Sequence, residues 1–311
     1  MKRTIIYLNS FLALTKSEDL IIQKYNSKDD VVLVLKSDPS LDYETRKTLL
    51  KEAFPNVKVI AQSQISSIAE DPYFFLDDDN EIEVKSFKTN KLIDVRKECP
   101  FYKSEKESLN LNHLSLSLNS LYFLLDHDLL FVKELSKYLS DHRFAHSKSV
   151  AKLALEIALK NALTNYEDIF VASLFHDIGK DLPLEEAEQI MKENYQEYLN
   201  YPPWCYHQFV GKYLSKKEFG IVNKEILDAI CYHCSGKANM NPLGKIVYAA
   251  DKIDPLRGWN SSFYIKECEK DYKKGFVEVL KANEEFLSQN DSQTKLPLSE
   301  ECYKYYLRRE K

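Results

Sequence analysis

The residues most suited to chemistry are a neighbouring histidine and aspartate, His176 and Asp177, followed after one residue by Gly179. Successive side chains on a helix point about 100° apart, so this pair can reach one metal ion only where a helix ends. Gly179 supplies such an end. Because an unpaired buried carboxylate is costly, a metal cation is the simplest partner for the pair.

Other metal-capable residues lie on apolar helix faces. His146 precedes Val150 by four residues, His233 follows Ile230 by three, and Asp251 follows an apolar residue by four. Taken singly, each is more typical of a hydrogen-bonded core residue. Together they favour a metal site, since buried imidazoles and carboxylates without a cation leave polar groups unsatisfied.

Four of the seven histidines fall one per expected helical segment. They are His146, His176, His207 and His233, and Asp251 follows 18 residues after the last of them. Helical patterning is nearly continuous from residue 121, with helices expected over 121–139, 141–163, 164–178, 184–199, 208–216, 223–234, 242–254 and 265–286. No strand pattern interrupts it. Residues 115–311 are therefore predicted to form an all-α domain.

Residues 1–114 are predicted to form an α/β domain that ends in a linker. Strands are expected at 4–8, 30–35 and 57–60 and a helix at 42–54, an order that indicates a doubly wound, Rossmann-type layer. The acidic run at 77–81 lacks the glycine and spacing of a calcium loop and is expected to be solvated. Polar residues at 97–112 indicate the linker.

The composition of the chain argues against several classes of protein. A net charge of −5 over 311 residues gives no basic excess to hold long nucleic acid. No apolar run approaches the roughly 18 residues that span a bilayer, and six cysteines in a chain this long are typical of reduced thiols. A cytoplasmic protein without a membrane partner is expected. Cys231 and Cys234 have zinc-site spacing, but no second pair completes such a site.

The order of histidines and aspartates resembles the HD phosphohydrolase superfamily, with His146, His176, Asp177 and Asp251 as its minimal motif. His207 and His233 fit the branch with a binuclear centre. The local sequences around these residues, over about 140–260, are similar to the YqeK-like symmetrical bis(5′-nucleosyl)-tetraphosphatases. Two positions depart from that pattern. Cys234 stands where threonine is usual and Asp254 where glutamate is usual, and both can alter metal preference without removing a ligand.

The start of the chain more weakly resembles the phosphate loop of nicotinate-nucleotide adenylyltransferases. Only Ser10 and Phe11 are kept, while Thr15 and Glu18 stand in the places of two histidines that hold the triphosphate. Glu18 would repel what a histidine attracts. The resemblance implies a degenerate nucleotidyltransferase-like domain, and the alternative is an unrelated α/β domain.

The HD resemblance implies a reaction. Two divalent ions, iron or alternatively manganese, would be held by His146, His176, Asp177, His207, His233 and Asp251. A metal-activated hydroxide would cleave diadenosine tetraphosphate at its centre into two ADP. Asp177, as the bridging carboxylate, and Lys180 are the catalytic candidates, and Arg143, Lys180, Trp204 and Arg257 are the candidate substrate contacts. The structural alternative is an exposed charge or ion pair for each cation and a core position for Trp204.

Two other functions remain compatible with the sequence. One is an HD phosphohydrolase that uses a single metal on a nucleoside mono- or triphosphate, which would leave His207 and His233 without a role. The other is a nucleotide-binding regulator in which both domains have lost turnover. The sequence carries no signal for an oligomeric state.

Overall fold

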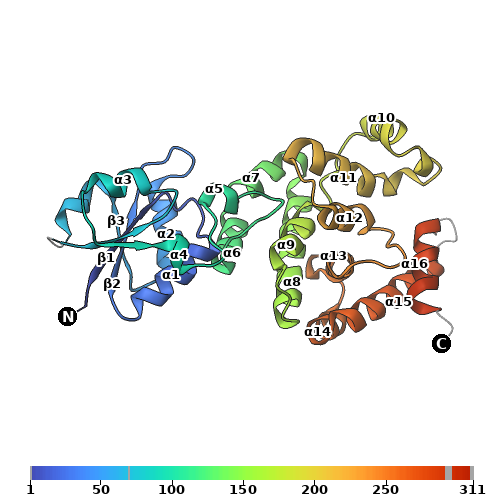
Figure 1. Cartoon of the computed structure of the whole chain (residues 1–311). Coiled ribbons are helices and arrows are strands. Elements are labelled where there is room, and N and C mark those ends of the chain that lie inside the picture. Colours follow the sequence, from blue (N-terminus) through green and yellow to red (C-terminus); the bar gives the residue numbers. More distant parts are fainter. Residues whose placement is uncertain (1, 69–70, 291–295, 309–311) are drawn as a thin grey trace. The chain divides into compact units, whose positions relative to one another are not determined.

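The chain contains two compact units, residues 1–127 (unit 1) and 128–311 (unit 2), in the computed structural model (Figure 1). The structure describes residues 2–68, 71–290 and 296–308. Each unit has its own hydrophobic core and is described by itself.

Unit 1 is built on a parallel sheet of five strands in the order β3-β2-β1-β4-β5. The strands are β1 (Thr4–Asn9), β2 (Asp30–Leu35), β3 (Lys58–Ala61), β4 (Tyr73–Leu76) and β5 (Leu92–Asp94). Ile5 of β1 pairs with Val31 on one side and with Tyr73 on the other. The strand order reverses between β1 and β4, the position where open α/β sheets bind ligands. The predicted α/β fold class is confirmed.

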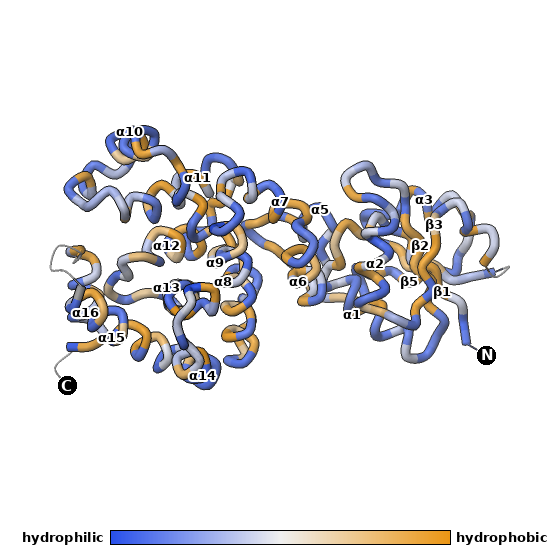
Figure 2. Tube along the Cα trace, turned by 180° about the vertical axis from the view of Figure 1, so that it is seen from behind, coloured by the Kyte–Doolittle hydropathy of each residue, from blue (hydrophilic) through white to orange (hydrophobic). Residues whose placement is uncertain are grey.

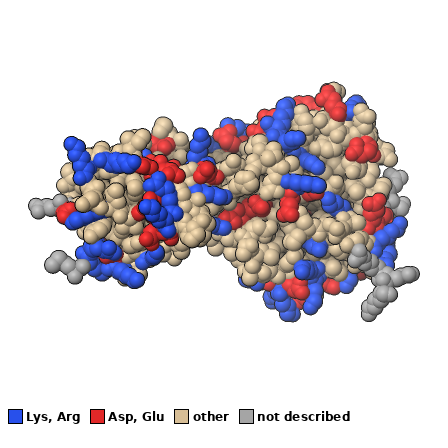
Figure 3. Space-filling view, viewed as in Figure 1, with Lys and Arg blue, Asp and Glu red and all other residues tan. Residues whose placement is uncertain are grey.

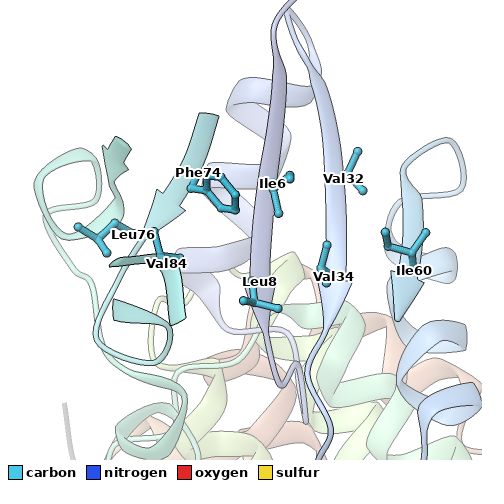
Figure 4. Packing of buried hydrophobic residues seen from close by; sticks show 8 residues of the cluster. All are labelled: Ile6, Leu8, Val32, Val34, Ile60, Phe74, Leu76 and Val84. Carbon is cyan, nitrogen blue, oxygen red and sulfur yellow. The ribbon is translucent and has the colours of Figure 1, made fainter. Parts of the chain in front are cut away.

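The strands form because their apolar runs are buried on both faces, as parallel sheets require. Figure 4 shows one such layer, with Ile6 and Leu8 of β1 between Val32 and Val34 of β2 and Phe74 of β4. The hydropathy colouring in Figure 2 marks β1 and β2 as largely hydrophobic. The three strands expected from the sequence are present. β4 and β5 were not expected.

Short helices complete unit 1. They are α1 (Lys16–Asn26), α2 (Tyr43–Ala53), α3 (Glu81–Ser86), α4 (Val95–Glu98), α5 (Glu105–Ser108) and α6 (Leu118–His127), with a 3₁₀ turn η1 (Gln62–Ser67). A capping box formed by Thr15 and Glu18 starts α1. Asp42 caps α2, the helix expected at 42–54.

Two segments of unit 1 differ from the solvated acidic loop and the linker that the sequence indicates. Asp77, at the start of the acidic run, is 1% exposed and accepts a hydrogen bond of 2.6 Å from the Tyr7 hydroxyl. Asn80 is fully buried. The expected linker contains α5, in which Glu105 and Ser108 are buried. The sequence pattern could not reveal these burials, because each depends on contacts distant in the chain.

The two compact units divide after α6, whereas the sequence indicates a domain division at residues 114/115. Leu14 explains this position, because its amide donates to the Ser120 hydroxyl and its carbonyl accepts from the Ser117 amide. Thr15 also forms a β-bridge with Leu116. The expected helix at 121–139 is consequently split between the two units.

All the regular elements of unit 2 among its described residues are helices. Its helices are α7 (Phe131–Leu135), α8 (Asp141–Lys160), α9 (Tyr166–Phe175), α10 (Leu184–Asn194), α11 (Tyr206–Phe219), α12 (Lys224–Tyr232), α13 (Pro242–Ile253), α14 (Ser262–Lys270), α15 (Tyr272–Asn290) and α16 (Pro297–Leu307). Short 3₁₀ turns are η2 (Ser136–Tyr138), η3 (Gln196–Tyr198), η4 (Pro203–Cys205) and η5 (Pro255–Arg257). The predicted all-α class is confirmed, although the expected helix at 265–286 is two helices.

Helix α9 lies at the centre of unit 2. It packs against α8, α12 and α13, and every residue from Ile169 to Phe175 is buried. This explains its sequence, which is apolar on all sides rather than on one stripe. The residues that follow α9 are therefore delivered into the middle of the helical unit.

The visible face of the molecule carries intermixed acidic and basic side chains (Figure 3). This agrees with the small net charge of −5. Among the helices that the structure describes, none is both long and apolar enough to cross a bilayer.

Candidate metal centre

The six predicted metal ligands converge inside unit 2. His146 lies on α8, His176 and Asp177 directly follow α9, His207 is in the first turn of α11, His233 directly follows α12, and Asp251 is near the end of α13. All six are at most 6% exposed. The other histidines, His113, His127 and His142, are exposed. Five separate helices thus bring their metal-capable residues to one place.

A glycine allows the turn after Asp177 to approach α11. A Cβ atom at Gly179 would lie 2.8 Å from both the backbone oxygen of His207 and the backbone nitrogen of Gly211. No side chain fits at those distances without a backbone shift. Gly179 therefore sets the separation between the His176–Asp177 pair and His207.

The ligand atoms form three overlapping groups, each with all atoms within 4.8 Å of one another. The groups are His146, His176 and Asp177; His176, His233 and Asp251; and Asp177, His207 and His233. His176, Asp177 and His233 each belong to two groups. The six residues are therefore one continuous cluster.

Three imidazoles are held in one orientation by the backbone. The Nδ1 atoms of His176, His207 and His233 lie 2.7, 2.9 and 2.7 Å from the carbonyl oxygens of Ser173, Trp204 and Ile230, each three residues earlier. A carbonyl oxygen only accepts, so Nδ1 carries the proton and donates it. The Nε2 atom of each ring is then an acceptor directed at the cluster, the arrangement typical of metal-binding histidines.

These acceptors face one another and the Asp177 carboxylate, and the donor that reaches one of them is Lys180, whose Nζ lies 3.3 Å from Nε2 of His207. The Nε2 atoms of His207 and His233 lie 3.1 Å apart, and each is 3.4 Å from Oδ1 of Asp177. The buried Nε2 of His176 has no hydrogen-bond partner among the described residues. Lone pairs converging in this way require a cation. The donor set therefore fits a divalent metal.

The two oxygens of Asp177 face different parts of the cluster. Oδ1 is directed at His207 and His233. Oδ2 lies 3.8 Å from Nε2 of His176 and 3.6 Å from the guanidinium of Arg143. The carboxylate thus stands between two sets of imidazoles.

The carboxylate of Asp254, which is not one of the six predicted ligands, orients the imidazole of His146. Its Nδ1 lies 2.6 Å from Oδ2 of Asp254, and its Nε2 lies 3.2 Å from Oδ1 of Asp251. Asp254 is fully buried and also accepts from the Ser149 hydroxyl. Burial lowers the pKa of His146, but the two carboxylates outweigh it and raise the pKa to about 9. The aspartate at position 254 therefore performs the orienting contact despite the departure from glutamate.

The charges of the other ligands suit metal binding. Burial raises the pKa of Asp177, but His176, His233 and His207, whenever they are protonated, hold it well below its usual value. Burial likewise opposes ionisation of Asp251, but Lys252 and Arg257 hold its pKa low. Burial lowers the pKa of the histidines at 207 and 233. Ionised carboxylates and neutral imidazoles are the protonation states that bind metal.

A cavity of about 380 Å³ opens onto the cluster. The four predicted substrate contacts, Arg143, Lys180, Trp204 and Arg257, all line it together with Asp177, His207, His233 and Asp251. Trp204 is 46% exposed, so the alternative that it fills the core is wrong.

Each of these three cations already has a protein partner. Arg143 donates to Asp181, Lys180 Nζ lies 3.3 Å from the acceptor Nε2 of His207, and Arg257 pairs with Asp251. Sequence reasoning missed Lys252, whose Nζ lies 2.7 Å from Oδ2 of Asp251, and Asn283. The position of Lys252 next to a ligand was the only available signal for it.

The cysteine pair does not join the metal-capable groups. Cys234 lines the cavity, but none of the three groups found among the described residues contains a cysteine. Burial raises the pKa of the Cys231 thiol to about 12, so it stays protonated. The zinc alternative at these cysteines therefore has no support in the geometry.

A helical unit that gathers four histidines and two aspartates in this order defines a metal-dependent hydrolase of the HD superfamily. The HD domain family matches residues 143–256, which lie within unit 2.

Comparison with individual proteins narrows this class. The chain is 33% identical over 152 residues to "Bis(5′-nucleosyl)-tetraphosphatase, symmetrical" of Bacillus subtilis, covering 48% of this chain and 81% of that protein. The chain therefore belongs to the symmetrical bis(5′-nucleosyl)-tetraphosphatase family of HD-domain enzymes.

Two further proteins are similar to this chain, and the match covers a different share of each of them. The chain is 34% identical over 161 residues to "Probable nicotinate-nucleotide adenylyltransferase/Ap4A hydrolase" of Mycoplasma genitalium, which covers 51% of this chain but only 45% of that protein. A crystal structure of a predicted HD superfamily hydrolase involved in NAD metabolism from Clostridium acetobutylicum matches with a TM-score of 0.51 and 27% identity. That match covers 58% of this chain and 96% of the other.

Proposed function

We propose that unit 2 hydrolyses diadenosine tetraphosphate symmetrically and releases two ADP. The observation that carries this proposal is the overlap of the three ligand groups, in which His207 and His233 extend the four-residue HD motif into a larger cluster. The names of the relatives supply the substrate class. A single-metal phosphohydrolase would not require the two additional histidines.

The six residues divide naturally between two ions. His146, His176 and Asp177 would hold one ion together with Asp251, which lies 3.2 Å from Nε2 of His146 and 3.7 Å from Nε2 of His176, and Asp177, His207 and His233 would hold the other. Asp177 would bridge them, because its two oxygens face the two sets. Imidazole and carboxylate ligands without thiolate favour iron or manganese. When bound, such ions polarise phosphoryl oxygens and lower the pKa of water.

The chain's own cations would hold the polyphosphate. Arg143 and Lys180 enter the cavity beside Asp177, and Lys252 and Arg257 enter beside Asp251. Cations on both sides of the metal ligands can grip a polyphosphate on either side of its central bond. This arrangement would favour symmetrical cleavage.

Product analysis tests this function. Metal-loaded protein incubated with diadenosine tetraphosphate should release ADP alone. Release of ATP with AMP would show asymmetric cleavage and contradict the proposal. Turnover confined to a nucleoside mono- or triphosphate would favour the single-metal alternative, and the absence of turnover with saturating iron or manganese would favour a regulator.

We propose that unit 1 is a degenerate nucleotidyltransferase-like domain that performs no adenylyl transfer. In its β1–α1 loop, the amides of Leu12 and Ala13 both donate to Oε1 of Glu105, so a protein carboxylate takes donors that phosphate would need. Glu18 is 3% exposed and bound by the Asn9 amide. A loop whose amides are already bound by a protein side chain disfavours a triphosphate.

An assay of adenylyl transfer tests the proposal for unit 1. Full-length protein given ATP and nicotinate mononucleotide should release no pyrophosphate above a blank, because the loop amides are occupied. Pyrophosphate release at a rate that Glu105→Ala increases would contradict it.

We also propose that the enzyme works in the cytoplasm, the compartment in which its six cysteines remain reduced thiols.

A further inference from the structure

A second cavity adjoins the metal-site cavity in unit 2. It has a volume of about 500 Å³ and is lined by Lys252, Ile253, Arg257, Trp259, Tyr264, Val279, Ala282, Asn283 and Phe286. Lys252, Arg257 and Asn283 also line the cavity of the metal ligands. The two cavities therefore share one wall, and that wall is cationic.

The far part of this second cavity is aromatic. The Trp259 ring packs edge-on against Tyr264 with ring centroids 5.6 Å apart, and Trp259 is 43% exposed. Phe286 of α15, 62% exposed, contributes another aromatic side chain. A mostly apolar pocket of this size with a few polar groups is typical of a small-molecule site. Exposed aromatic faces are the groups on which nucleobases stack.

We propose that this second cavity binds one of the two nucleobases of the substrate, with the base stacked on Trp259. The polyphosphate would pass over Lys252 and Arg257 into the metal-site cavity, where Trp204 is available to the second base. This inference rests on the proposed function and adds a base site to it. A dinucleoside polyphosphate has a base at each end, and such a pair of sites would hold both.

The distribution of tryptophans makes the proposal directly measurable. The chain has two tryptophans, and each lines a different cavity. Trp204→Phe leaves Trp259 as the sole tryptophan and reporter of the second cavity, while Trp259→Phe leaves Trp204 as the reporter of the metal-site cavity. A stacked adenine quenches the fluorescence of the indole it covers.

Fluorescence titration of the metal-loaded, full-length variants is the test. In Trp204→Phe, ADP should quench Trp259 saturably, and pyrophosphate, which lacks a base, should not. Quenching by ADP in Trp259→Phe but none in Trp204→Phe would overturn the proposal. This readout does not depend on turnover. A parent protein that fails to cleave diadenosine tetraphosphate but still shows the Trp259 quench would contradict the proposed function alone.

Kinetics provides a second readout. Trp259→Ala should raise KM for diadenosine tetraphosphate about tenfold with little change in kcat, because base stacking contributes to binding rather than to the reacting bond. Trp259→Phe should restore most of the loss. Phe101→Ala is the control, since this aromatic is 52% exposed but belongs to unit 1. An unchanged KM in Trp259→Ala would count against the base site.

Discussion

The Nε2 atoms of His207 and His233 lie 3.1 Å apart, and the opposite nitrogen of each ring donates to a backbone carbonyl. Both facing atoms are therefore acceptors. Two lone pairs held this close inside a buried site repel unless a cation lies between them. The backbone thus prepares a metal site before any metal binds.

Removing the metal should destabilise unit 2. A ligand that binds only the folded state stabilises it by about 2.7 kcal/mol at a concentration 100-fold above its Kd. We expect chelator-treated protein to unfold at a lower temperature and added manganese to reverse the change. Differential scanning calorimetry provides the measurement. Equal melting temperatures with and without metal would show that the acceptors are satisfied in another way.

Asp254→Ala should weaken metal binding without removing a ligand. The Asp254 carboxylate holds Nδ1 of His146, and loss of such an orienting contact typically costs 10–100-fold in metal affinity or activity. Activity should recover at high manganese concentration. Asp254→Glu should retain most of the affinity because it keeps the carboxylate. A manganese titration of both variants checks this. Equal metal affinities of Asp254→Ala and Asp254→Glu would show that Asp254 does not orient His146.

Gly179→Ala should impair activity and stability together. The new Cβ would clash with backbone atoms of His207 and Gly211 and separate the turn that follows Asp177 from α11. Such overpacking costs about 1–3 kcal/mol. Gly220→Ala is the matched control: its φ is +64° and no atom lies within 4 Å, so it should lose stability but keep kcat. Equal kcat in both variants would refute the positional role of Gly179.

Lys180→Met should lower kcat/KM for diadenosine tetraphosphate. A charge-assisted hydrogen bond to phosphate is worth about 1.5–3 kcal/mol, which corresponds to roughly 10- to 150-fold. Steady-state kinetics is the measurement. Lys160→Met removes a lysine on α8 that pairs with Glu269 and lines neither cavity, so it should leave kcat/KM unchanged. Similar losses in both variants would indicate a general effect of charge.

The stability of unit 1 should fall as the pH rises from about 5 to 8. Burial raises the pKa of Glu105 to about 7, with nearby Asp79 acting in the same direction, and burial also raises the pKa of Asp77 to about 6. A raised pKa in the folded state means that folding takes up a proton at Glu105. The stability that this proton contributes is therefore fully present below the unfolded pKa near 4.5. It is lost as the pH rises through the folded pKa of about 7. The shift of Glu105 corresponds to at most about 3 kcal/mol.

Hydrogen exchange of peptides covering residues 10–15 can measure this dependence. After correction for the intrinsic rate, protection should be greater at pH 5 than at pH 8. Glu105→Gln should reduce the difference, because an amide oxygen accepts from Leu12 without a charge. Protection that increases with pH, or that is the same in both proteins, would show that Glu105 does not control the loop.

The sequence singled out most of the residues that the structure gathers into one cluster, because helical periodicity is a local signal. His146 and Asp251 share stripes with buried residues of their own helices, and the pair after α9 ends an apolar run. His207 precedes the helix expected at 208–216, so its helix face was not seen, and it was singled out by the distribution of histidines over the expected helical segments and by the resemblance. The only sequence signal for Lys252 was that it directly follows Asp251.

Unit 1 was less predictable because its polar contacts join distant segments. Glu105 meets an amide 93 residues earlier, and Asp77 meets a hydroxyl 70 residues earlier. Local composition therefore indicated a linker and a solvated loop where the structure has buried carboxylates. β5, with three residues, is too short for a periodic pattern to reveal.

The metal content of the purified protein tests the two-ion site most directly. Elemental analysis after loading with iron or manganese should find two ions per chain in the parent and about one in the double variant His207→Ala/His233→Ala, which retains the four residues of the HD motif. One ion per chain in the parent, or an unchanged ratio in the variant, would contradict the account.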